Sequence, residues 1–358
     1  MYRIRQYIRP EQIREFSLIF IIILVVLFFG TQIEGYFSAR TFDRVASSVA
    51  IITVIAVGQT LVILTRNIDL SVGSIVGFAA YYAGQQVSLH QELSPIAVIG
   101  LAVAFGAILG AINGVIVAYA RVPSIITTLG TLAIYRGILV EYAQAKTITT
   151  QMMPQWLLDL PRQNLLTIGD VQVRVMVGLA IVVVIVAQLS LNYLRFGRRL
   201  YAIGSNPDAA RIAGLPSRRL VMMTYILCGA LSGLAGFMFL VRFGTITVSA
   251  GQGLELSAVA AAVVGGVNTF GGSGTAFGTL LGAVVIGTLQ QSLLRMQNVS
   301  QFVQDALLGL FILLAVASDS VILARLRKVW AGWRETAKQK AMPASTPTEE
   351  DSSHAAQP

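Results

Sequence analysis

Long apolar stretches alternate with short polar ones along most of the chain. A helix that crosses a membrane needs about 20 apolar residues. Ten stretches meet or approach this length, at 16–31, 45–65, 71–89, 94–120, 124–144, 172–192, 220–242, 254–267, 274–294 and 302–319. The fifth, which contains Arg136 and Glu141, and the short eighth fit the pattern least well. The pattern predicts an all-α integral membrane protein, a bundle of about ten transmembrane helices.

The composition agrees with a membrane protein. Hydrophobic residues make up 55% of the chain, the mean hydropathy is +0.72, and only 12% of residues are charged. Soluble domains have about 25% charged residues. The net charge of +9 would suggest nucleic acid as a partner of a soluble protein. Here the arginines lie in short loops and near the ends, as the positive-inside rule expects, so we predict no nucleic-acid binding.

The charges at the two ends place both termini on the same side of the membrane. Four arginines precede the first stretch, and six basic residues follow the last one. Both termini are therefore expected in the cytoplasm, which requires an even number of spans. We expect a cytoplasmic segment over 1–15, a transmembrane domain over 16–320, and a basic and then disordered cytoplasmic tail over 321–358.

The most informative polar segment is the arginine-rich loop at 195–219. It reads RFGRRLYAIGSNPDAARIAGLPSRR, with six arginines and one acidic residue. A short helix is predicted inside it, with Ser205 or Asn206 as N-cap, Asp208 in the first turn and Gly214 at its end. Such a helix on a basic loop predicts contact with a soluble partner, although the loop could instead serve only to fix the topology.

Two polar interruptions separate neighbouring spans almost without a loop. They are TRNIDLSVGS at 65–74 and VGGVNTFGGSG at 264–274. Asp69 in the first is a natural N-cap for the following helix. Irregular backbone at membrane depth persists only where protein buries it or where it lines a watery cavity, and paired breaks in transporters mark binding sites or hinges. The two breaks do not align as a five-plus-five repeat, and turning of the chain alone would also explain them.

Polar residues within or between the spans are candidates for a solute pathway or a hinge. Those selected are Gln59, Asp69, Asn113, Thr131, Glu255 and Asn268. Amides and hydroxyls suit a neutral, hydroxyl-rich solute, and a row of carboxylates that would favour an ion is missing. Hydrogen bonding between helices is the alternative role for each of them.

Two glycine ladders predict close helix packing. Gly106, Gly110 and Gly114 recur at every fourth position, and so do three glycines at 274, 278 and 282. This spacing places each ladder on one face of a helix, where two backbones can approach closely.

The sequence lacks the motifs of an enzyme. It has no phosphate-binding loop of the GxxxxGK(S/T) type, two histidines that are far apart, and one cysteine, Cys228. These residues supply no metal cluster, no histidine-centred triad and no internal disulfide. We therefore predict no catalytic residues, no metal site and a non-catalytic role.

A series of motifs carries a resemblance to a known family. In order they are GQTLVIL at 58–64, IDLSVG at 68–73, PSIITTLGTL at 123–132, GRRLYAIGSNP at 197–207, AARIAG at 209–214, GLEL at 253–256 and VGG at 264–266. Over roughly residues 40–320 the chain resembles the membrane permease subunits of bacterial ATP-binding-cassette sugar importers. The resembling branch includes the ribose, xylose, rhamnose and autoinducer-2 systems.

The resemblance implies a location and a set of partners. The location is the inner membrane of a bacterium. The partners are a second permease chain, identical or related, a cytoplasmic ATPase that binds ATP and Mg²⁺ on its own chain, and an extracytoplasmic sugar-binding protein. This chain itself would bind no cofactor.

The resemblance also implies roles for particular residues. The 205–214 helix would be the coupling helix, with Asn206, Asp208, Ala210, Arg211 and Gly214 as its site residues. Asp208, Ala210 and Arg211 would face a groove of the ATPase.

The solute implied by the resemblance is a sugar or sugar-like polyol, with rhamnose, autoinducer-2 or a pentose as candidates. Arg66 and Asn67 stand where many members have two glycines. This variant is similar to the rhamnose and autoinducer-2 branches.

Two alternatives stay open at the level of sequence. One is an ion-driven secondary transporter without an ATPase, and the other is a membrane scaffold that recruits a soluble protein. The direction of transport rests on the resemblance, because spans and charges do not indicate it.

Overall fold

The structure is a bundle of helices of unequal length. The computed structural model describes residues 10–168 and 171–296, together with single positions between 300 and 313, and its first compact unit ends at Gly309. The long helices are α1 (Pro10–Gln32), α2 (Ala39–Leu64), α3 (Val72–Leu89), α4 (Pro95–Ala118), α5 (Ser124–Ala143), α7 (Val175–Tyr193), α10 (Ser217–Phe243) and α12 (Ala276–Leu293). The shorter ones are α6 (Gln155–Asp159), α8 (Arg195–Ser205), α9 (Pro207–Ile212) and α11 (Leu254–Val264).

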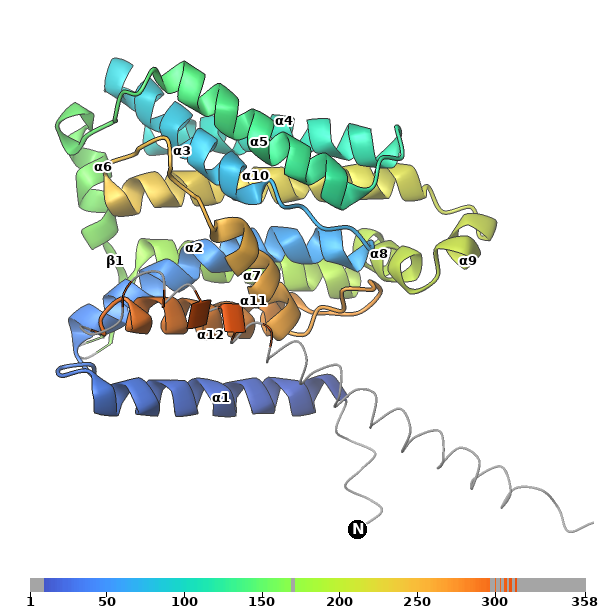
Figure 1. Ribbon diagram of the computed structural model, residues 1–358, viewed down its shortest axis with the longest axis horizontal. Helices are drawn as coiled ribbons and strands as arrows, with labels where there is room; N and C mark the ends of the chain where they lie inside the picture. Colours follow the sequence, from blue (N-terminus) through green and yellow to red (C-terminus); the bar gives the residue numbers. More distant parts are fainter. Residues whose placement is uncertain are drawn as a thin grey trace, which may run out of the picture. The chain divides into compact units, whose positions relative to one another are not determined.

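Helix α2 lies at the centre of the bundle. It packs against α7, α10, α11 and α12, and 94% of its most apolar 18-residue window is buried (Figure 1). A helix that is apolar on all sides is stable in such a position because every face meets another apolar surface. Helix α1 contacts α12 from the outside and exposes Phe16, Phe20 and Phe28, as expected of a helix that faces lipid.

Seven helices in the described part are long and apolar enough to cross a membrane. They are α1 from Arg14 onward, α2, α4, α5, α7, α10 and α12. The predicted stretches at 71–89 and 254–267 correspond to α3 and α11. The 11 residues of α11 extend about 16 Å, roughly half of the hydrocarbon thickness. The stretch at 302–319 and the tail beyond it lie almost wholly outside the described residues.

The first glycine ladder packs α4 against α10, as predicted. A Cβ atom added to Gly106 would lie 2.2 Å from the carbonyl oxygen of Gly229, and one added to Gly110 would lie 2.3 Å from that of Tyr225. Gly229 is equally close to α4, since its Cβ would lie 2.3 Å from the Gly106 oxygen. The two backbones therefore touch without intervening side chains.

The second ladder was predicted wrongly at one position. Gly278 and Gly282 on α12 do pack against α11, with added Cβ atoms 2.2 Å and 2.0 Å from carbonyl oxygens of Gly265 and Ala261. Gly274 precedes the helix, with φ +145, because Thr275 caps α12 by accepting a hydrogen bond from the Gly278 N–H at 2.9 Å. It therefore shares no helix face with the other two.

The segment between α5 and α7 contains regular secondary structure. It contains the 3-10 turns η1 (Thr150–Met152) and η2 (Leu160–Arg162), α6, and an antiparallel hairpin of β1 (Asn164–Ile168) and β2 (Val171–Arg174). The hairpin was missing from the all-α prediction, and it takes over residues 172–174 of the predicted sixth span. Arg174 ties it to α2 through an ion pair with Asp43 at 2.6 Å.

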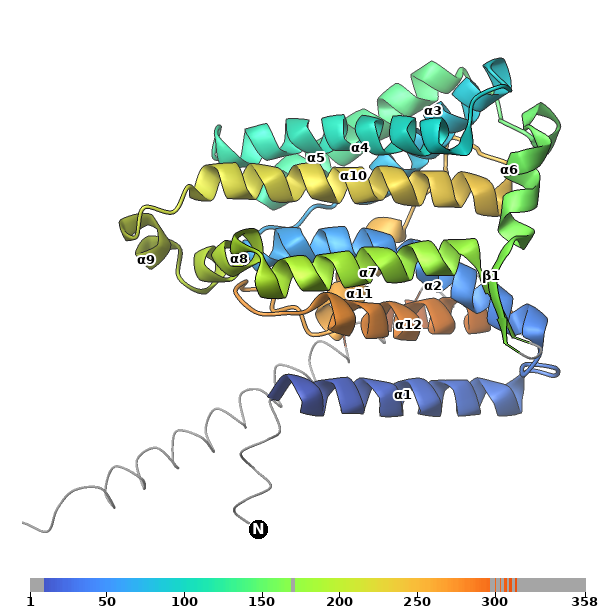
Figure 2. The same cartoon turned by 180° about the vertical axis from the view of Figure 1, so that it is seen from behind.

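The bundle has two distinct ends. Helices α8 and α9 project from one end, here called the basic end, whereas α6 and the hairpin cover the opposite end (Figures 1 and 2). Helix α2 runs towards the basic end, where the Leu64 oxygen accepts a hydrogen bond from Gly272 N. Helix α3 then runs to the opposite end, where Tyr81 OH donates to the oxygen of Lys146 at 3.0 Å.

Helices α3 and α11 begin side by side inside the bundle and run in opposite directions (Figure 1). Helix α3 follows the non-helical segment 65–71, and α11 follows a second one at 244–253. An added Cβ on Gly251 would lie 2.4 Å from the Gly73 oxygen, so the two starts touch. The segment that corresponds to the break at 65–71 is therefore 244–253, which the sequence analysis missed, rather than the connection before α12.

Candidate functional site

A chain of hydrogen bonds links buried polar side chains at the start of α3. The Asp69 Oδ1 atom accepts hydrogen bonds from Ser71 N at 2.9 Å and Ser71 Oγ at 2.6 Å. Asn113 of α4 donates to Ser71 Oγ at 2.8 Å, and Tyr135 of α5 donates to Asn113 Oδ1 at 3.2 Å. With Gln59 these residues form the central polar cluster, in which no member is more than 3% exposed.

Gln59 of α2 holds the irregular backbone of this cluster. With its amide nitrogen turned to the Asp69 carbonyl, the Gln59 side chain donates to Asp69 O and accepts from Asp69 N, both at 3.1 Å. It thereby supplies partners for the backbone N–H and C=O of a residue that lies between two helices. The second carboxylate oxygen of Asp69 is buried and has no hydrogen-bond partner among the described residues.

The structure brings together three of the residues that the sequence analysis selected, Gln59, Asp69 and Asn113. One detail was wrong: Asp69 does not cap α3, because the N-cap position is Ser71 and Asp69 bonds to Ser71 itself. Tyr135 was not among the residues selected from the sequence. Its position four residues after Thr131, on the same face of α5, was the available signal.

A second polar contact lies where α3 meets α11. Arg136 Nη1 donates to the oxygens of Val248 at 2.8 Å and Ala250 at 2.7 Å, which ties α5 to the segment 244–253. Glu255 Oε1 accepts from Gly253 N at 3.2 Å, while Oε2 is buried without a partner in the described part of the chain.

Arg136 and Glu255 approach the same face of α3. An added Cβ on Gly73 would lie 1.9 Å from Glu255 Oε2, and one on Gly77 would lie 3.0 Å from Arg136 Nη1. The two glycines are one helical turn apart. Glycine is favoured at both positions chiefly because backbone oxygens lie close as well: added Cβ atoms would be 2.7 Å from the Gly251 oxygen at Gly73 and 2.1 Å from the Ala250 oxygen at Gly77.

The remaining two pathway candidates lie apart from these contacts. Thr131 is buried and donates to the Thr128 oxygen of its own helix at 3.4 Å. Asn268 shapes the turn between α11 and α12, since its side-chain oxygen accepts from Phe270 N at 3.0 Å. Asn268 is thus a turn residue at the basic end and is not part of the central polar cluster.

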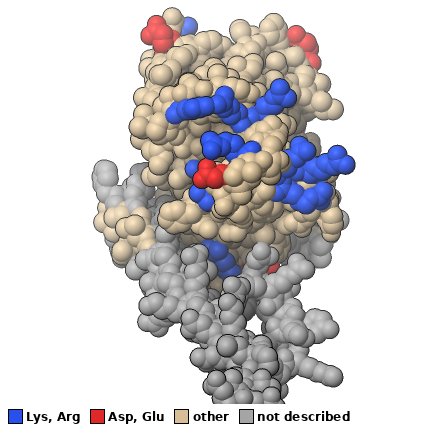
Figure 3. Space-filling model, turned by 90° about the vertical axis from the view of Figure 1, so that its right-hand side faces the viewer, with Lys and Arg blue, Asp and Glu red and all other residues tan. Residues whose placement is uncertain are grey.

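The arginine-rich loop forms two helices rather than one. Helix α8 is amphipathic, with Leu200 and Ile203 buried and Arg198 and Arg199 exposed. Helix α9 follows directly and forms the outermost part of the basic end (Figure 2). Lys and Arg side chains gather on this end of the molecule with few acidic ones among them (Figure 3).

Helix α9 begins and ends as the sequence predicts. Asn206 is its N-cap and accepts a hydrogen bond from Ala209 N at 3.0 Å, and Gly214 follows its end with φ +73. Asp208 and Arg211 are exposed. Ala210 is only 4% exposed and packs in a cluster with Leu200 and Leu220, so the expectation that it faces outward is wrong. It holds α9 onto the bundle.

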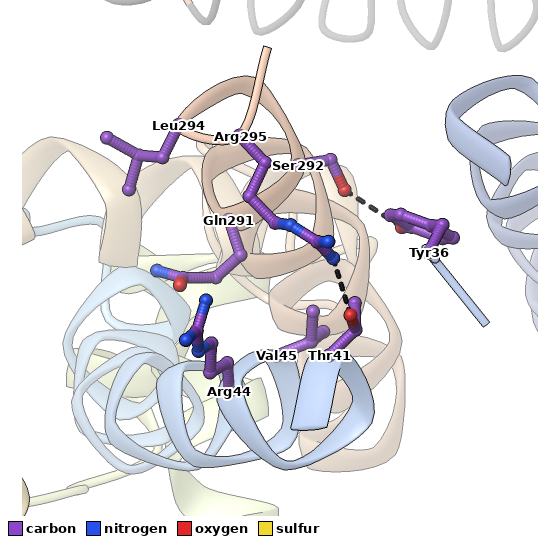
Figure 4. A pocket seen from close by; sticks show the side chains of 8 residues that line it. All are labelled: Tyr36, Thr41, Arg44, Val45, Gln291, Ser292, Leu294 and Arg295. Atoms are coloured by element: carbon purple, nitrogen blue, oxygen red, sulfur yellow. Dashed lines mark hydrogen bonds between the residues drawn. The ribbon is translucent and has the colours of Figure 1, made fainter. Parts of the chain in front are cut away.

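A small pocket lies at the opposite end of the bundle, between the start of α2 and the end of α12. Its cavity measures about 160 Å³. It is lined by Tyr36, Thr41, Arg44, Val45, Gln291, Ser292, Leu294 and Arg295 (Figure 4). Tyr36 OH and Ser292 Oγ share a hydrogen bond of 2.8 Å, and Arg295 donates to Thr41. None of the residues selected from the sequence lines this pocket.

Broken helices that meet inside a membrane bundle, with an exposed helical loop at one end, define a membrane transport subunit. Comparison with known families agrees. Residues 41–316 match a family model described as "Branched-chain amino acid transport system / permease component". The chain belongs to this permease family, and it is an integral, multi-pass membrane protein of the bacterial inner membrane.

Curated relatives cover almost the whole chain. The chain is 34% identical over 315 residues to the autoinducer 2 import system permease protein LsrC of Salmonella typhi, with 88% of each chain covered. The protein of the same name from Yersinia enterocolitica is 34% identical over 307 residues, covering 86% of this chain and 82% of the relative. The Escherichia coli protein is 34% identical as well, with 88% and 89% covered. No solved structure matches the chain.

Proposed function

We propose that this chain forms the translocation pathway of an ATP-driven importer for a sugar or sugar-like polyol, with autoinducer-2 as the first candidate solute. The observation that carries the proposal is the capped, exposed helix α9 on a chain whose relatives are import permeases. The family description names branched-chain amino acids, so membership alone leaves the solute class open.

The chemistry of the interior favours a neutral, hydroxyl-rich solute. Four of the five side chains of the central polar cluster are hydroxyls or amides, which both donate and accept hydrogen bonds as sugar hydroxyls do; the fifth is Asp69, and in this arrangement the cluster is buried and its members bond to one another. A free amino acid would need partners for an ammonium and a carboxylate group together. The Arg136 guanidinium is already engaged by two carbonyl oxygens, which leaves it poorly placed to bind a carboxylate.

Helix α9 is the proposed contact with the ATPase. Asp208 and Arg211 present opposite charges on an exposed surface, while Ala210 anchors the helix beneath them. We propose that both termini and the basic end lie in the cytoplasm. The ATPase would bind ATP and Mg²⁺ on its own chain, a second permease chain would complete the pathway, and a sugar-binding protein would dock at the opposite end.

The first experiment identifies what copurifies with the tagged protein from its native host in mild detergent. A stoichiometric ATPase is expected, and Arg211→Glu should remove it because reversal of charge opposes docking. Arg195→Glu, an exposed arginine at the start of α8, is the matched control and should keep the ATPase. Normal ATPase binding and uptake by the Arg211→Glu variant would contradict the assignment of α9.

Uptake measurements test the solute class. Cells that depend on this system should take up labelled autoinducer-2, with competition by rhamnose or ribose and none by leucine. Uptake should depend on ATP and continue in the presence of an ionophore. Competition by leucine alone would show that the solute is a branched-chain amino acid and not a sugar-like compound.

A further inference from the structure

Arg66 connects the end of α8 to the break before α3. Its Nε atom donates to the Gly204 oxygen at 2.6 Å, and its Nη2 atom donates to the Ser205 oxygen at 2.9 Å. These carbonyls belong to the last turn of α8, where helix carbonyls lack partners within the helix and carry partial negative charge. The planar guanidinium therefore clamps two adjacent carbonyls directly before α9.

Three separate segments interlock at this point. Gly204 lies against the last carbonyl of α2, since an added Cβ would be 1.9 Å from the Leu64 oxygen. The same Leu64 oxygen accepts a hydrogen bond from Gly272 N at 3.1 Å. Tyr201 of α8 donates to the Gly274 oxygen at 2.7 Å. The end of α8 therefore packs against the end of α2 and the turn before α12, and the Arg66 hydrogen bonds link it to the segment that leads to α3.

The backbone of Arg66 has an unusual conformation for a residue with a side chain. Arg66 has φ +66, a left-handed conformation that follows the end of α2 and that glycine adopts at lowest cost. A residue with a side chain is strained in this conformation, and interactions of that side chain can offset the strain. The two hydrogen bonds to α8 are such interactions.

The backbone leads from Arg66 to the interior of the bundle within a few residues, so a displacement of Arg66 would be passed to the interior. The next residues of the segment 65–71 lead to Asp69, whose backbone is held by Gln59, and to Ser71, which bonds to Asn113. Gly73 then touches Gly251 at the start of α11.

We infer that Arg66 is the positioning residue that transmits movement of the α8–α9 unit to the meeting point of α3 and α11. The inference rests on the proposed function, because it takes α9 as the contact with the ATPase. Arg66 acts through the backbone it holds and need not touch the solute.

The decisive variant is Arg66→Gly, which removes the clamp while favouring the left-handed backbone. Arg121→Gly is the matched control. Arg121 also has positive φ, at +59, and is exposed, and its side chain has no hydrogen bond or ion pair within the described residues. Arg66→Lys keeps the charge but lacks the planar fork, so its effect should be intermediate.

The readout is the accessibility of the segment before α11 in the purified complex with its ATPase. Gln252→Cys, in a chain that also carries Cys228→Ala, places a single thiol on this segment, because Cys228 is the chain's one cysteine. Addition of ATP and vanadate should change the rate of maleimide labelling. In Arg66→Gly this change should shrink by about tenfold, within the range typical of coupling between sites. In Arg121→Gly it should persist.

The outcomes separate this inference from the proposed function. Absence of any copurifying ATPase from the unmodified chain would refute the proposed function. With an ATPase present, three results would overturn the role of Arg66. The first is loss of the ATPase from the Arg66→Gly variant, and the second is an equal reduction of the labelling change by Arg66→Gly and Arg121→Gly. The third is no ATP-dependent change in labelling when Arg66 and Arg121 are both intact. Full retention of the change in Arg66→Gly would overturn it as well. Thermal unfolding of Arg66→Lys alongside Arg66→Gly shows whether the fold is intact.

Discussion

The contact between α4 and α10 predicts that a single methyl group at Gly106 destabilises the protein. In Gly106→Ala the new Cβ would lie 2.2 Å from the Gly229 oxygen and 2.8 Å from the backbone nitrogen of Gly233. Both are backbone atoms of a helix, so no flexible side chain can move aside. The two helices must instead separate by about 1 Å to reach an ordinary van der Waals contact.

The magnitude follows from two opposing terms. Overpacking of a tight interior costs about 1–3 kcal/mol, whereas alanine in place of glycine within a helix gains about 1 kcal/mol. Because the whole α4–α10 interface must shift, we place the first term near its upper limit, which leaves a net loss of about 1–2 kcal/mol. Gly130→Ala on α5 is the control, since no described atom outside its own helix lies within 4 Å of the added methyl group. It should be neutral or stabilising.

Thermal unfolding in detergent, followed by size-exclusion chromatography of a fluorescent fusion, measures this difference. A loss of 1 kcal/mol in the free energy of unfolding lowers the melting temperature by about 2–4 °C, so Gly106→Ala should melt about 5 °C below Gly130→Ala. Gly229→Ala should behave like Gly106→Ala, because its added Cβ would lie 2.3 Å from the Gly106 oxygen. A melting temperature of Gly106→Ala at or above that of the unmodified protein would refute the packing argument.

Two further predictions concern the interior. Asn113→Ala should lower stability by only about 1 kcal/mol, because Ser71 keeps its hydrogen bond to Asp69 and Tyr135 keeps its hydrogen bond to the Leu109 oxygen at 2.9 Å. The same variant should reduce uptake severalfold. A loss of stability without any loss of uptake would assign Asn113 a purely structural role. Gly251→Ala should abolish uptake while the ATPase still binds, because the methyl group would lie 2.4 Å from the Gly73 oxygen. Gly253→Ala is the control and should retain most uptake, since Gly253 also has positive φ but no described atom would lie within 4 Å of the methyl group. Equal uptake by both variants would contradict this prediction.

The sequence predicted those features whose signal is local. An apolar run of 20 residues is recognisable without knowledge of its neighbours, so α4, α5 and α10 were found to within three residues at each end, and α2 was found although it begins six residues before the predicted stretch. The same holds for α9, whose cap and final glycine lie within nine residues. The side of α9 that faces outward was not predictable, because Ala210 is buried by contacts with Leu200 and Leu220 that its own turn does not specify.

The missed break at 244–253 shows where local reasoning fails. Its sequence, GTITVSAGQG, has no charge and reads equally well as an outer loop or as backbone inside the bundle. Five of its ten residues are exposed, and it is tied to α5 by Arg136, more than 100 residues earlier, whose guanidinium supplies partners for two of its carbonyls. The short eighth stretch at 254–267 was the one local signal, since 14 residues cannot span the membrane alone.

The non-helical segments before α3 and α11 are held at opposite ends of the bundle. This arrangement suggests how the pathway could open alternately to the two sides of the membrane. The segment before α3 is held at the basic end through Arg66, while the segment before α11 is held at the opposite end through the paired backbones of Ile148 and Ile246. The two segments meet where Gly73 touches Gly251. A movement that starts at the basic end and a docking event at the opposite end would therefore act on the same contact. Since interfaces packed as tightly as this one switch between discrete arrangements rather than deform gradually, that contact is suited to pass a signal in either direction.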